Sequence, residues 1–388
     1  MNPVPHRRLC VFGGYQDTDL YPRNRALIEA VSRNFDSVVE VRPATPAKSS
    51  VRHRDVARLK TLFRLIWRYL ATFFSLARQA GAVRGADTVF IPYPAYVDFF
   101  FLKVILLGRK QPKLIIDAFL CLHDTLVNDR KLLRPDTMMA RLVAWLEAHT
   151  LSAADLIFID TNQQRELLVH SYHLPPGRLI VTPVGIDEAL WSPLDFLPMD
   201  NKFRVIFWGT FIPLHGLQYV VSAAAIIAGR NPKIEFRIIG DGQTADQVAR
   251  QIADSDVPNI TWERSLISGA ELRSEVARSH CVLGVFGASE KAGNVVPYKV
   301  YQAMACNKLV ISREGPAIYE LARTSDNSSG LFLVPPADPE ALASTIEEIY
   351  CGYSCLCSQV ATRKLYDSFL SNSVLQSRID AALLLGDT

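Results

Sequence analysis

The chain has 388 residues, of which 49% are hydrophobic and 21% are charged. This balance excludes a disordered or fibrous chain, and the length suggests two domains. The seven cysteines are scattered and odd in number, which fits a reducing cytoplasm better than a disulfide framework. The longest apolar stretch is interrupted by Lys60, Arg64 and Arg68, so we expect no membrane span. The apolar stretch near the N-terminus is too short for a signal-peptide core.

The net charge of +3 hides a basic block. Residues 48–113 contain 13 Lys and Arg against three Asp, a net of +10. The rest of the chain then holds 29 basic and 36 acidic residues, a net of −7. Such a block indicates a polyanionic partner, either nucleic acid or an anionic membrane.

Short apolar runs alternate with helical patterns along the first half of the chain, as in parallel sheets whose strands are buried on both faces. The predicted strands are 9–12, 37–41, 88–91, 113–117, 156–159 and 179–182. The predicted helices are 23–33, 55–79, 96–107, 136–150 and 163–170.

A second alternating series begins near residue 203. Its predicted strands are 203–208, 234–239, 260–262, 281–285, 309–312 and 331–334. Its predicted helices are 216–228, 244–253, 269–279, 297–305, 317–322 and 339–351, followed by a last helical stretch at 359–385.

Two such series predict an α/β chain with two Rossmann-like, doubly wound domains. We place the first domain at 1–187, a Pro- and acid-rich linker at 188–202 and the second domain at 203–352. Residues 353–388 should carry a C-terminal helix. Ligands of open α/β sheets bind at the carboxyl ends of the strands, so we expect a substrate in a cleft between the domains.

Glycines follow three of the predicted strands and allow the backbone to approach a ligand closely. A plain tight turn is the alternative for the first pair. The candidate ligand-binding positions are Gly13, Gly14, Gly209, Thr210, Gly240 and Gly242.

A loop from Asn294 feeds a helix through Pro297. The free backbone amides at a helix start suit a diphosphate, and here they include those of Val295 and Val296. Lys299 adds a positive charge one turn into the helix.

The second half resembles the donor domain of the retaining glycosyltransferases of the GT-B fold, family 4. Gly209, Gly216, the Gly-Asp-Gly turn at 240–242 and the Ala-Met-Ala at 303–305 stand at the family's motif positions. The run at 182–187 resembles the end of the family's acceptor domain. The resemblance extends from Gly13 to about Leu333. It also implies that the C-terminal helix at 353–388 crosses back to the first domain.

The sequence departs from the family pattern at four positions. Asn294 and Gln302 stand where the family has two glutamates, Thr210 where it has a basic residue, and His215 where it has a lysine. Amides still form hydrogen bonds with sugar and ribose hydroxyls, so we expect an active enzyme. Glu290 either supplies a missing carboxylate or is a solvated loop acid.

The resemblance implies roles for these residues. His215, Lys299 and the two loop amides would hold the diphosphate, Gln302 the ribose and Asn294 the sugar, while Gly14 would let the first domain's loop close. In the first domain the family often places a histidine against the donor sugar, and Asp117, His123 and Asp124 are the candidates near that point. Helix capping by Asp124 and an exposed His123 are the alternative.

The predicted helix 55–79 has an apolar face opposite a basic face. It is either an ordinary outer helix of the domain or a helix that lies in a membrane interface. The neighbouring Phe-Phe-Phe-Leu-Lys at 99–103 favours the membrane, and the placement of aromatic residues on the apolar face disfavours nucleic acid. The predicted membrane-binding residues are Lys60, Arg64, Trp67 and Arg68.

Together these features predict a retaining hexosyltransferase that uses a nucleotide diphosphate sugar as co-substrate and needs neither cofactor nor metal. Its acceptor would be a lipid-linked or membrane-associated glycan in polysaccharide biosynthesis. The protein would be cytoplasmic and peripheral to the inner face of the membrane. Two alternatives stay open, namely an inactive pseudo-transferase that binds a glycan or a partner, and a nucleotide-sugar epimerase.

Overall fold

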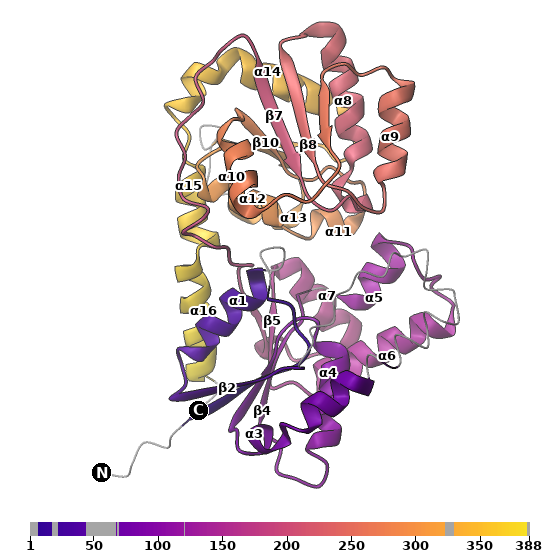
Figure 1. The fold of residues 1–388 in the computed structure, drawn as a ribbon, viewed down its shortest axis with the longest axis vertical. Helices are drawn as coiled ribbons and strands as arrows, with labels where there is room; N and C mark the ends of the chain where they lie inside the picture. The colour runs from indigo at the N-terminus through magenta and orange to yellow at the C-terminus, as the bar shows by residue number, and fades with distance from the viewer. Residues whose placement is uncertain are drawn as a thin grey trace. The chain divides into compact units, whose positions relative to one another are not determined.

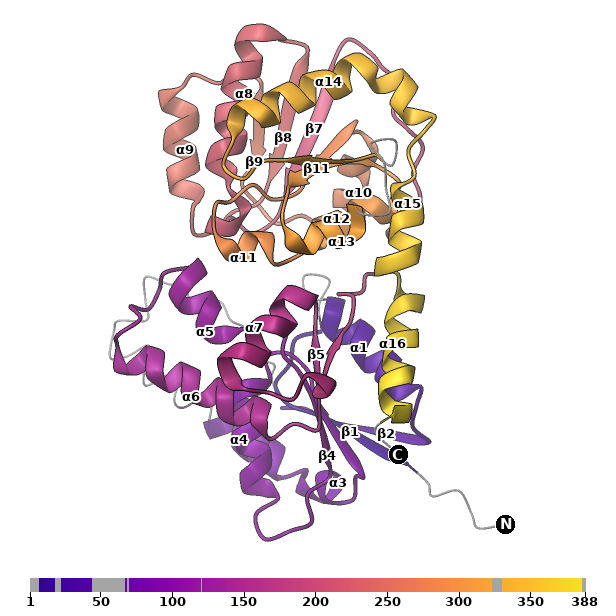
Figure 2. The same ribbon diagram turned by 180° about the vertical axis from the view of Figure 1, so that it is seen from behind.

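The chain forms two compact units in the computed structural model, which describes residues 7–17, 22–43, 67, 70–119, 121–322 and 330–385. Unit 1 consists of residues 1–127, 133–182 and 375–388, and unit 2 of 128–132 and 183–374. Each unit is an α/β fold with its own parallel sheet (Figures 1 and 2).

Unit 1 is built on a six-stranded parallel sheet with the order β2-β1-β3-β4-β5-β6. All six predicted strands of this half are confirmed, with ends that agree to within one residue. The strands are β1 (Arg8–Phe12), β2 (Ser37–Val41), β3 (Thr88–Ile91), β4 (Lys113–Asp117), β5 (Leu156–Ile159) and β6 (Leu179–Val181).

Helices cover both faces of this sheet. One face packs against α1 and α16, and the other packs against α3, α4 and α7. Residues 70–77 are also helical. The elements are α1 (Pro22–Ser32), α3 (Ala80–Arg84), α4 (Ala95–Ile105), α5 (Leu122–Asp124), η2 (Thr125–Asp129), α6 (Met138–Ser152), α7 (Asn162–Tyr172), η3 (Pro176–Arg178) and α16 (Asn372–Leu385).

The last helix of the chain belongs to the core of unit 1. Leu375, Ile379 and Leu383 of α16 are buried together with Val11 of β1 and Leu27 of α1. The apolar face of β1 is therefore closed by residues more than 360 positions away in the sequence.

Unit 2 is built on a second parallel sheet, with the order β12-β11-β10-β7-β8-β9. This is the order of a Rossmann fold, in which the connections reverse direction between β7 and β10. The strands are β7 (Phe203–Trp208), β8 (Ile234–Ile239), β9 (Ile260–Glu263), β10 (Cys281–Leu283), β11 (Leu309–Arg313) and β12 (Leu331–Val334).

Helices α8, α9 and α14 cover one face of this sheet, as Figure 1 shows. On the other face, Gln302 of α12 contacts Trp208, and Glu275 of α10 contacts Arg237. The elements are η4 (Pro213–His215), α8 (Leu217–Arg230), α9 (Ala245–Asp254), α10 (Gly269–Ala277), α11 (Glu290–Gly293), α12 (Tyr298–Ala305), α13 (Pro316–Ala322), α14 (Pro339–Cys357), α15 (Thr362–Leu365) and η6 (Tyr366–Leu370).

Two segments differ from the expectation. In the segment 188–202, predicted as a linker, Trp191 is buried and stacks on Trp208 with ring centroids 6.4 Å apart, so this segment packs within unit 2. The single helix predicted at 359–385 is three elements, because α15 passes directly into the π-helix η6 and the chain then turns at Ser371 before α16.

A buried ion pair fixes the start of α1 to the carboxyl ends of two strands. Arg23 lies against Asp117 at the end of β4, with 2.9 Å between Nη2 and Oδ1, and both side chains are buried. The same Nη2 donates to the hydroxyl of Thr182, 3.1 Å away and just after β6.

We expect Arg23→Met to lower the free energy of unfolding by about 3–5 kcal/mol, because it leaves a buried carboxylate without a counter-charge. The double variant Arg23→Met/Asp117→Leu should recover much of this loss, since it removes both charges. Thermal and urea unfolding measure both effects. A single variant as stable as the wild type would contradict the structural role of this pair.

Candidate functional site

The loops at the carboxyl ends of β7, β8 and β10 meet at the point where the strand order of unit 2 reverses. Gly209 follows β7 with a φ of 140°. A Cβ atom at this position would lie 3.2 Å from His215 Cε1 and 3.5 Å from Lys299 Nζ. A Cβ atom at Gly240, after β8, would overlap the Gly209 carbonyl oxygen. Glycine at these two positions therefore allows two loops and two basic side chains to come together.

Lys299 is a buried cation at this edge of the sheet, with 5% of its surface exposed. Its Nζ lies 3.8 Å from the centroid of the Phe207 ring and 3.5 Å from the Gly284 carbonyl oxygen. No carboxylate among the described residues pairs with it. Burial holds the pKa of Lys299 well below its usual value. A buried ammonium without a counter-charge is stabilised by an anion bound beside it.

His215 lies beside Lys299 and offers a hydrogen bond rather than a charge. Its ring packs edge-on against Phe207, and its buried Nδ1 has no hydrogen-bond partner. Burial, followed by the nearby charge of Lys299, holds the pKa of His215 well below its usual value. The imidazole is therefore neutral near pH 7.

The loop before α12 runs from a short helix into the Pro297 cap. Asn294 caps α11 at its C-terminal end, Val295 is partly exposed and Val296 is buried. Lys299 is the second residue of α12, so its side chain starts beside the amide groups of the first turn. Glu290 is exposed at the first position of α11.

Gln302 is buried one turn beyond Lys299 on α12. Its amide oxygen accepts a hydrogen bond of 3.0 Å from the indole Nε1 of Trp208, which is also buried. The carbonyl half of this amide is thus engaged within the protein. A role in ribose binding would fall to its NH2 group.

The other glycine positions of unit 2 fix the loops. Gly242 forms a bridge with Phe211, and the Phe211 amide donates to the Asp241 carbonyl at 3.0 Å. Thr210 is exposed between these fixed points.

In unit 1 the Gly13–Gly14 loop follows β1 and rests on a carboxylate that the sequence did not reveal. The Gly14 amide donates to Asp98 Oδ2 at 2.8 Å. A Cβ atom at Gly13 would lie 2.5 Å from the same oxygen. Burial raises the pKa of Asp98 to about 7, and the Gly14 hydrogen bond opposes this shift. Asp98 is the only acid in the apolar helix α4, which is the signal that could have identified it.

The three polar candidates after β4 occupy different environments. Asp117 is fully buried and bound by Arg23, so it is not open to a ligand in this arrangement. Burial raises the pKa of Asp117, and the charge of Arg23 opposes the shift. His123 and Asp124 are partly exposed in α5.

Helix α5 is held by a second carboxylate that the sequence did not reveal. The buried Glu147 of α6 accepts hydrogen bonds from the amides of Leu122 and His123, at 2.6 and 3.1 Å. It also accepts from the hydroxyls of Tyr96 and Tyr172, at 2.8 and 2.7 Å. Its position in the buried stripe of an amphipathic helix is the signal that could have marked it.

The predicted membrane-binding residues lie largely outside the described residues. This applies to Lys60, Arg64 and Arg68, whereas Trp67 is described and 68% exposed. None of the helices in the described ranges combines the length and the apolar character that a bilayer span requires. Within the same ranges, no three histidine, cysteine or carboxylate side chains gather so that they could hold a metal ion.

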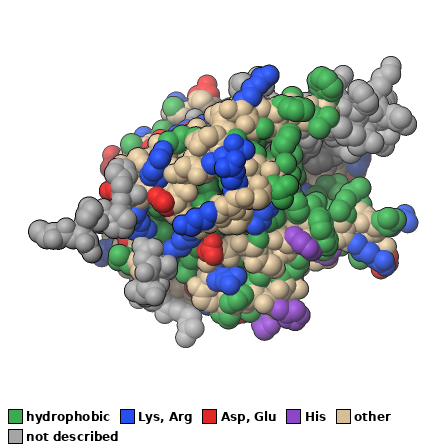
Figure 3. Space-filling view, turned by 90° about the horizontal axis from the view of Figure 1, so that it is seen from below, with side chains coloured by type: hydrophobic (Ala, Val, Ile, Leu, Met, Phe, Trp, Pro, Cys, Tyr) green, Lys and Arg blue, Asp and Glu red, His purple; other side chains and the backbone are tan. Residues whose placement is uncertain are grey.

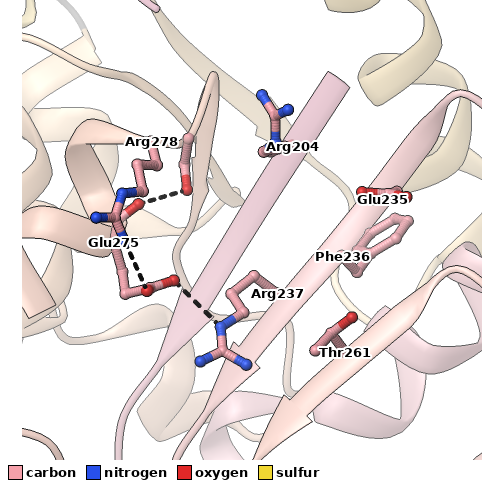
Figure 4. A pocket seen from close by; sticks show the side chains of 8 residues that line it. Arg204, Glu235, Phe236, Arg237, Thr261, Glu275 and Arg278 are labelled. Atoms are coloured by element: carbon pink, nitrogen blue, oxygen red, sulfur yellow. Dashed lines mark hydrogen bonds and ion pairs between the residues drawn. The ribbon is translucent and has the colours of Figure 1, made fainter. Parts of the chain in front are cut away.

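A cavity of about 220 Å³ lies elsewhere in unit 2, near the amino ends of β7 and β8. Figure 4 shows Glu275 between Arg237 and Arg278, with contacts of 3.2 and 3.6 Å. Arg204 pairs with Asp200 at 2.7 Å. Because its arginines are already paired and it lies at the amino ends of the strands, this cavity is a weaker anion site than the surroundings of Lys299.

Comparisons with known proteins relate this chain to glycosyltransferases. Residues 202–351 match the family described as glycosyl transferases group 1. The probable glycosyltransferase WbjE of Pseudomonas aeruginosa is 26% identical over 296 residues, which cover 72% of this chain and 70% of WbjE.

Solved structures share the fold of the whole chain. Sucrose-phosphate synthase from Thermosynechococcus elongatus matches with a TM-score of 0.71 at 14% identity, over 98% of this chain and 100% of that one. Anabaena HepE, solved in complex with UDP and glucose, matches with a TM-score of 0.67 at 15% identity, over 97% and 99% of the two chains. The whole chain therefore has the GT-B fold of these structures, and its residues 202–351 are similar to the glycosyl transferases group 1.

Proposed function

We propose that the protein transfers a sugar, with retention of anomeric configuration, from a nucleotide diphosphate sugar to a lipid-linked or membrane-associated glycan. The observation that carries the donor assignment is the buried ammonium of Lys299, which has no carboxylate partner among the described residues. The HepE structure contains UDP, which supports a nucleoside diphosphate as the anion.

The chemistry follows from the charges at this edge of unit 2. When the bond between sugar and diphosphate breaks, negative charge grows on the leaving diphosphate. Lys299 and the first-turn amides of α12 would stabilise that charge, which lowers the barrier more than it stabilises the bound substrate. His215 would donate a hydrogen bond as a neutral imidazole. In this proposal the chain itself supplies the positive charge, and no metal ion or cofactor takes part.

Asn294 and Gln302 would bind the donor as amides. Trp208 holds the Gln302 oxygen, so the NH2 group can face a ribose hydroxyl. Asn294 would bind the sugar. If the protein binds nucleotide diphosphates but neither transfers nor hydrolyses the sugar, the pseudo-transferase function is supported instead.

The acceptor and the cellular location complete the proposal. Unit 1 would bind the acceptor at the carboxyl edge of its sheet, near the Gly13–Gly14 loop. The basic block at 48–113 supports a role at the cytoplasmic face of a membrane in polysaccharide biosynthesis. NMR of the anomeric proton of the product tests retention.

Lys299→Met should weaken nucleotide diphosphate binding about tenfold or more, since a charged hydrogen bond contributes about 1.5–3 kcal/mol. The melting temperature without ligand should not fall, because methionine removes a desolvated charge and keeps the volume. Calorimetry with UDP, GDP and ADP, together with thermal unfolding, measures both properties.

Lys308→Met is the matched control. Lys308 is also buried in unit 2, but its Nζ donates to the carbonyls of Asp195 and Ser279, at 3.3 and 3.2 Å. This variant should lose stability and keep nucleotide affinity in its folded fraction. Unchanged affinity in Lys299→Met would refute the donor site.

The pH dependence gives an independent test. Burial lowers the folded-state pKa of Lys299 below the 10.5 of an exposed lysine. Between these two pKa values the unfolded chain binds a proton that the folded chain does not, so stability should rise with pH. Nucleotide binding in this window should take up a proton, measured by calorimetry in buffers of different ionisation enthalpy. Equal proton uptake in wild type and Lys299→Met would exclude Lys299 as its source.

Gln302→Ala should reduce stability by about 1–3 kcal/mol, because it leaves the buried indole N–H of Trp208 without an acceptor. Gln302→Glu keeps an acceptor and should remain close to wild type in stability. Transfer or slow hydrolysis of the donor should fall in Gln302→Ala by more than the loss of folded protein explains. Full turnover per folded molecule would show that Gln302 is only structural.

A further inference from the structure

Three helical segments of unit 1 expose large apolar side chains. They are residues 70–77, α4 and α6, and the most exposed side chain is that of Met138, at 87%. Figure 3 shows hydrophobic side chains gathered on one side of a face of the molecule, with lysine and arginine side chains nearby. The exposed apolar side chains of these three segments, together with Trp67 and with Leu107 just after α4, form a set that we call the apolar surface. It consists of Trp67, Leu70, Phe74, Val97, Val104, Leu107, Met138, Met139, Leu142 and Trp145.

Aromatic contacts join the three segments. Phe73 packs against Phe101 of α4, with ring centroids 5.3 Å apart. Phe100 of α4 stacks on Trp145 of α6, with centroids 5.6 Å apart. The exposed side chains therefore belong to one continuous region rather than to scattered positions.

Helix α6 is apolar on two faces. Its buried face includes Ala140, Val143 and Leu151, which the core of unit 1 explains. Its exposed face carries Met138, Leu142 and Trp145, whose i, i+4 and i+7 spacing places them in one stripe. A second apolar stripe on a surface helix marks an interaction site.

The exposed lysine and arginine side chains of α4 and α6 have no exposed acid beside them on the same two helices. The two acids in α4 and α6 are Asp98 and Glu147, and both are buried. Lys103 and Arg141 are exposed on the same two helices. Two copies meeting through this surface would bring these cations together, which opposes a symmetric dimer.

We propose that the apolar surface docks on an anionic lipid bilayer. Met138, Leu142 and Trp145 would enter the interface, and Lys103 and Arg141 would lie at the headgroups. The surface would lie on the membrane rather than span it. This inference rests on the proposed function in one respect, namely that the acceptor is held at a membrane.

Flotation of the full chain with vesicles tests the proposal. The wild type should bind vesicles of equal parts phosphatidylglycerol and phosphatidylcholine, bind pure phosphatidylcholine weakly, and lose binding as salt rises. Met138→Glu/Leu142→Glu should bind the anionic vesicles about tenfold or more weakly. The matched control is Leu266→Glu, since Leu266 is 59% exposed in unit 2, and it should bind like the wild type.

Two further variants separate the contributions. Lys103→Glu/Arg141→Glu should weaken binding by a similar factor and flatten its salt dependence. Trp145→Phe should remove much of the blue shift in tryptophan fluorescence on vesicle binding, because Trp145 would be the tryptophan of α6 that enters the lipid.

The outcomes are distinct from those that test the donor site. UDP affinity, measured by calorimetry, should be the same in all of these variants, so loss of vesicle binding alone leaves the donor assignment intact. A wild type that does not bind anionic vesicles, or a Met138→Glu/Leu142→Glu variant that binds like the wild type, overturns the proposal. A dimer that dissociates in this variant, without vesicle binding, also overturns it in favour of a protein interface.

Discussion

Desolvation of the Lys299 ammonium is the constraint on which the proposed donor site depends. Among the buried lysines of unit 2, Lys308 and Lys299 differ in their partners. Lys308 donates to backbone carbonyls and its pKa falls only to about 8, whereas Lys299 has an aromatic ring and one long hydrogen bond. The fold itself supplies the hydrogen-bond acceptors of Lys308. In the proposed function, a bound anion would be the partner of Lys299.

The amides at 294 and 302 fit this constraint. Lys299 and Gln302 are one helical turn apart on α12, so a carboxylate at 302 would lie close enough to offset the ammonium charge. Glutamine leaves that charge available and still accepts the Trp208 hydrogen bond. The two departures from the glutamate pattern are therefore compatible with donor binding.

The strands could be predicted from the sequence because strands buried on both faces are apolar runs that end abruptly at glycine or polar residues. The resemblance located His215, the predicted helix start located Lys299, and the structure brings the two together at Gly209. Asp98, Glu147 and Arg23 could not be assigned in the same way. Each lies in a helix, and its partners come from distant segments that only the tertiary fold brings close.

The position of α16 has a consequence for biosynthesis. The hydrophobic face formed by β1 and α1 stays uncovered on the ribosome until Leu375, Ile379 and Leu383 emerge. The unit that is synthesised first is thus completed last, after all of unit 2 has been made. A nascent chain stalled before residue 375 would carry an open core and would be a natural client for chaperones that bind exposed apolar segments.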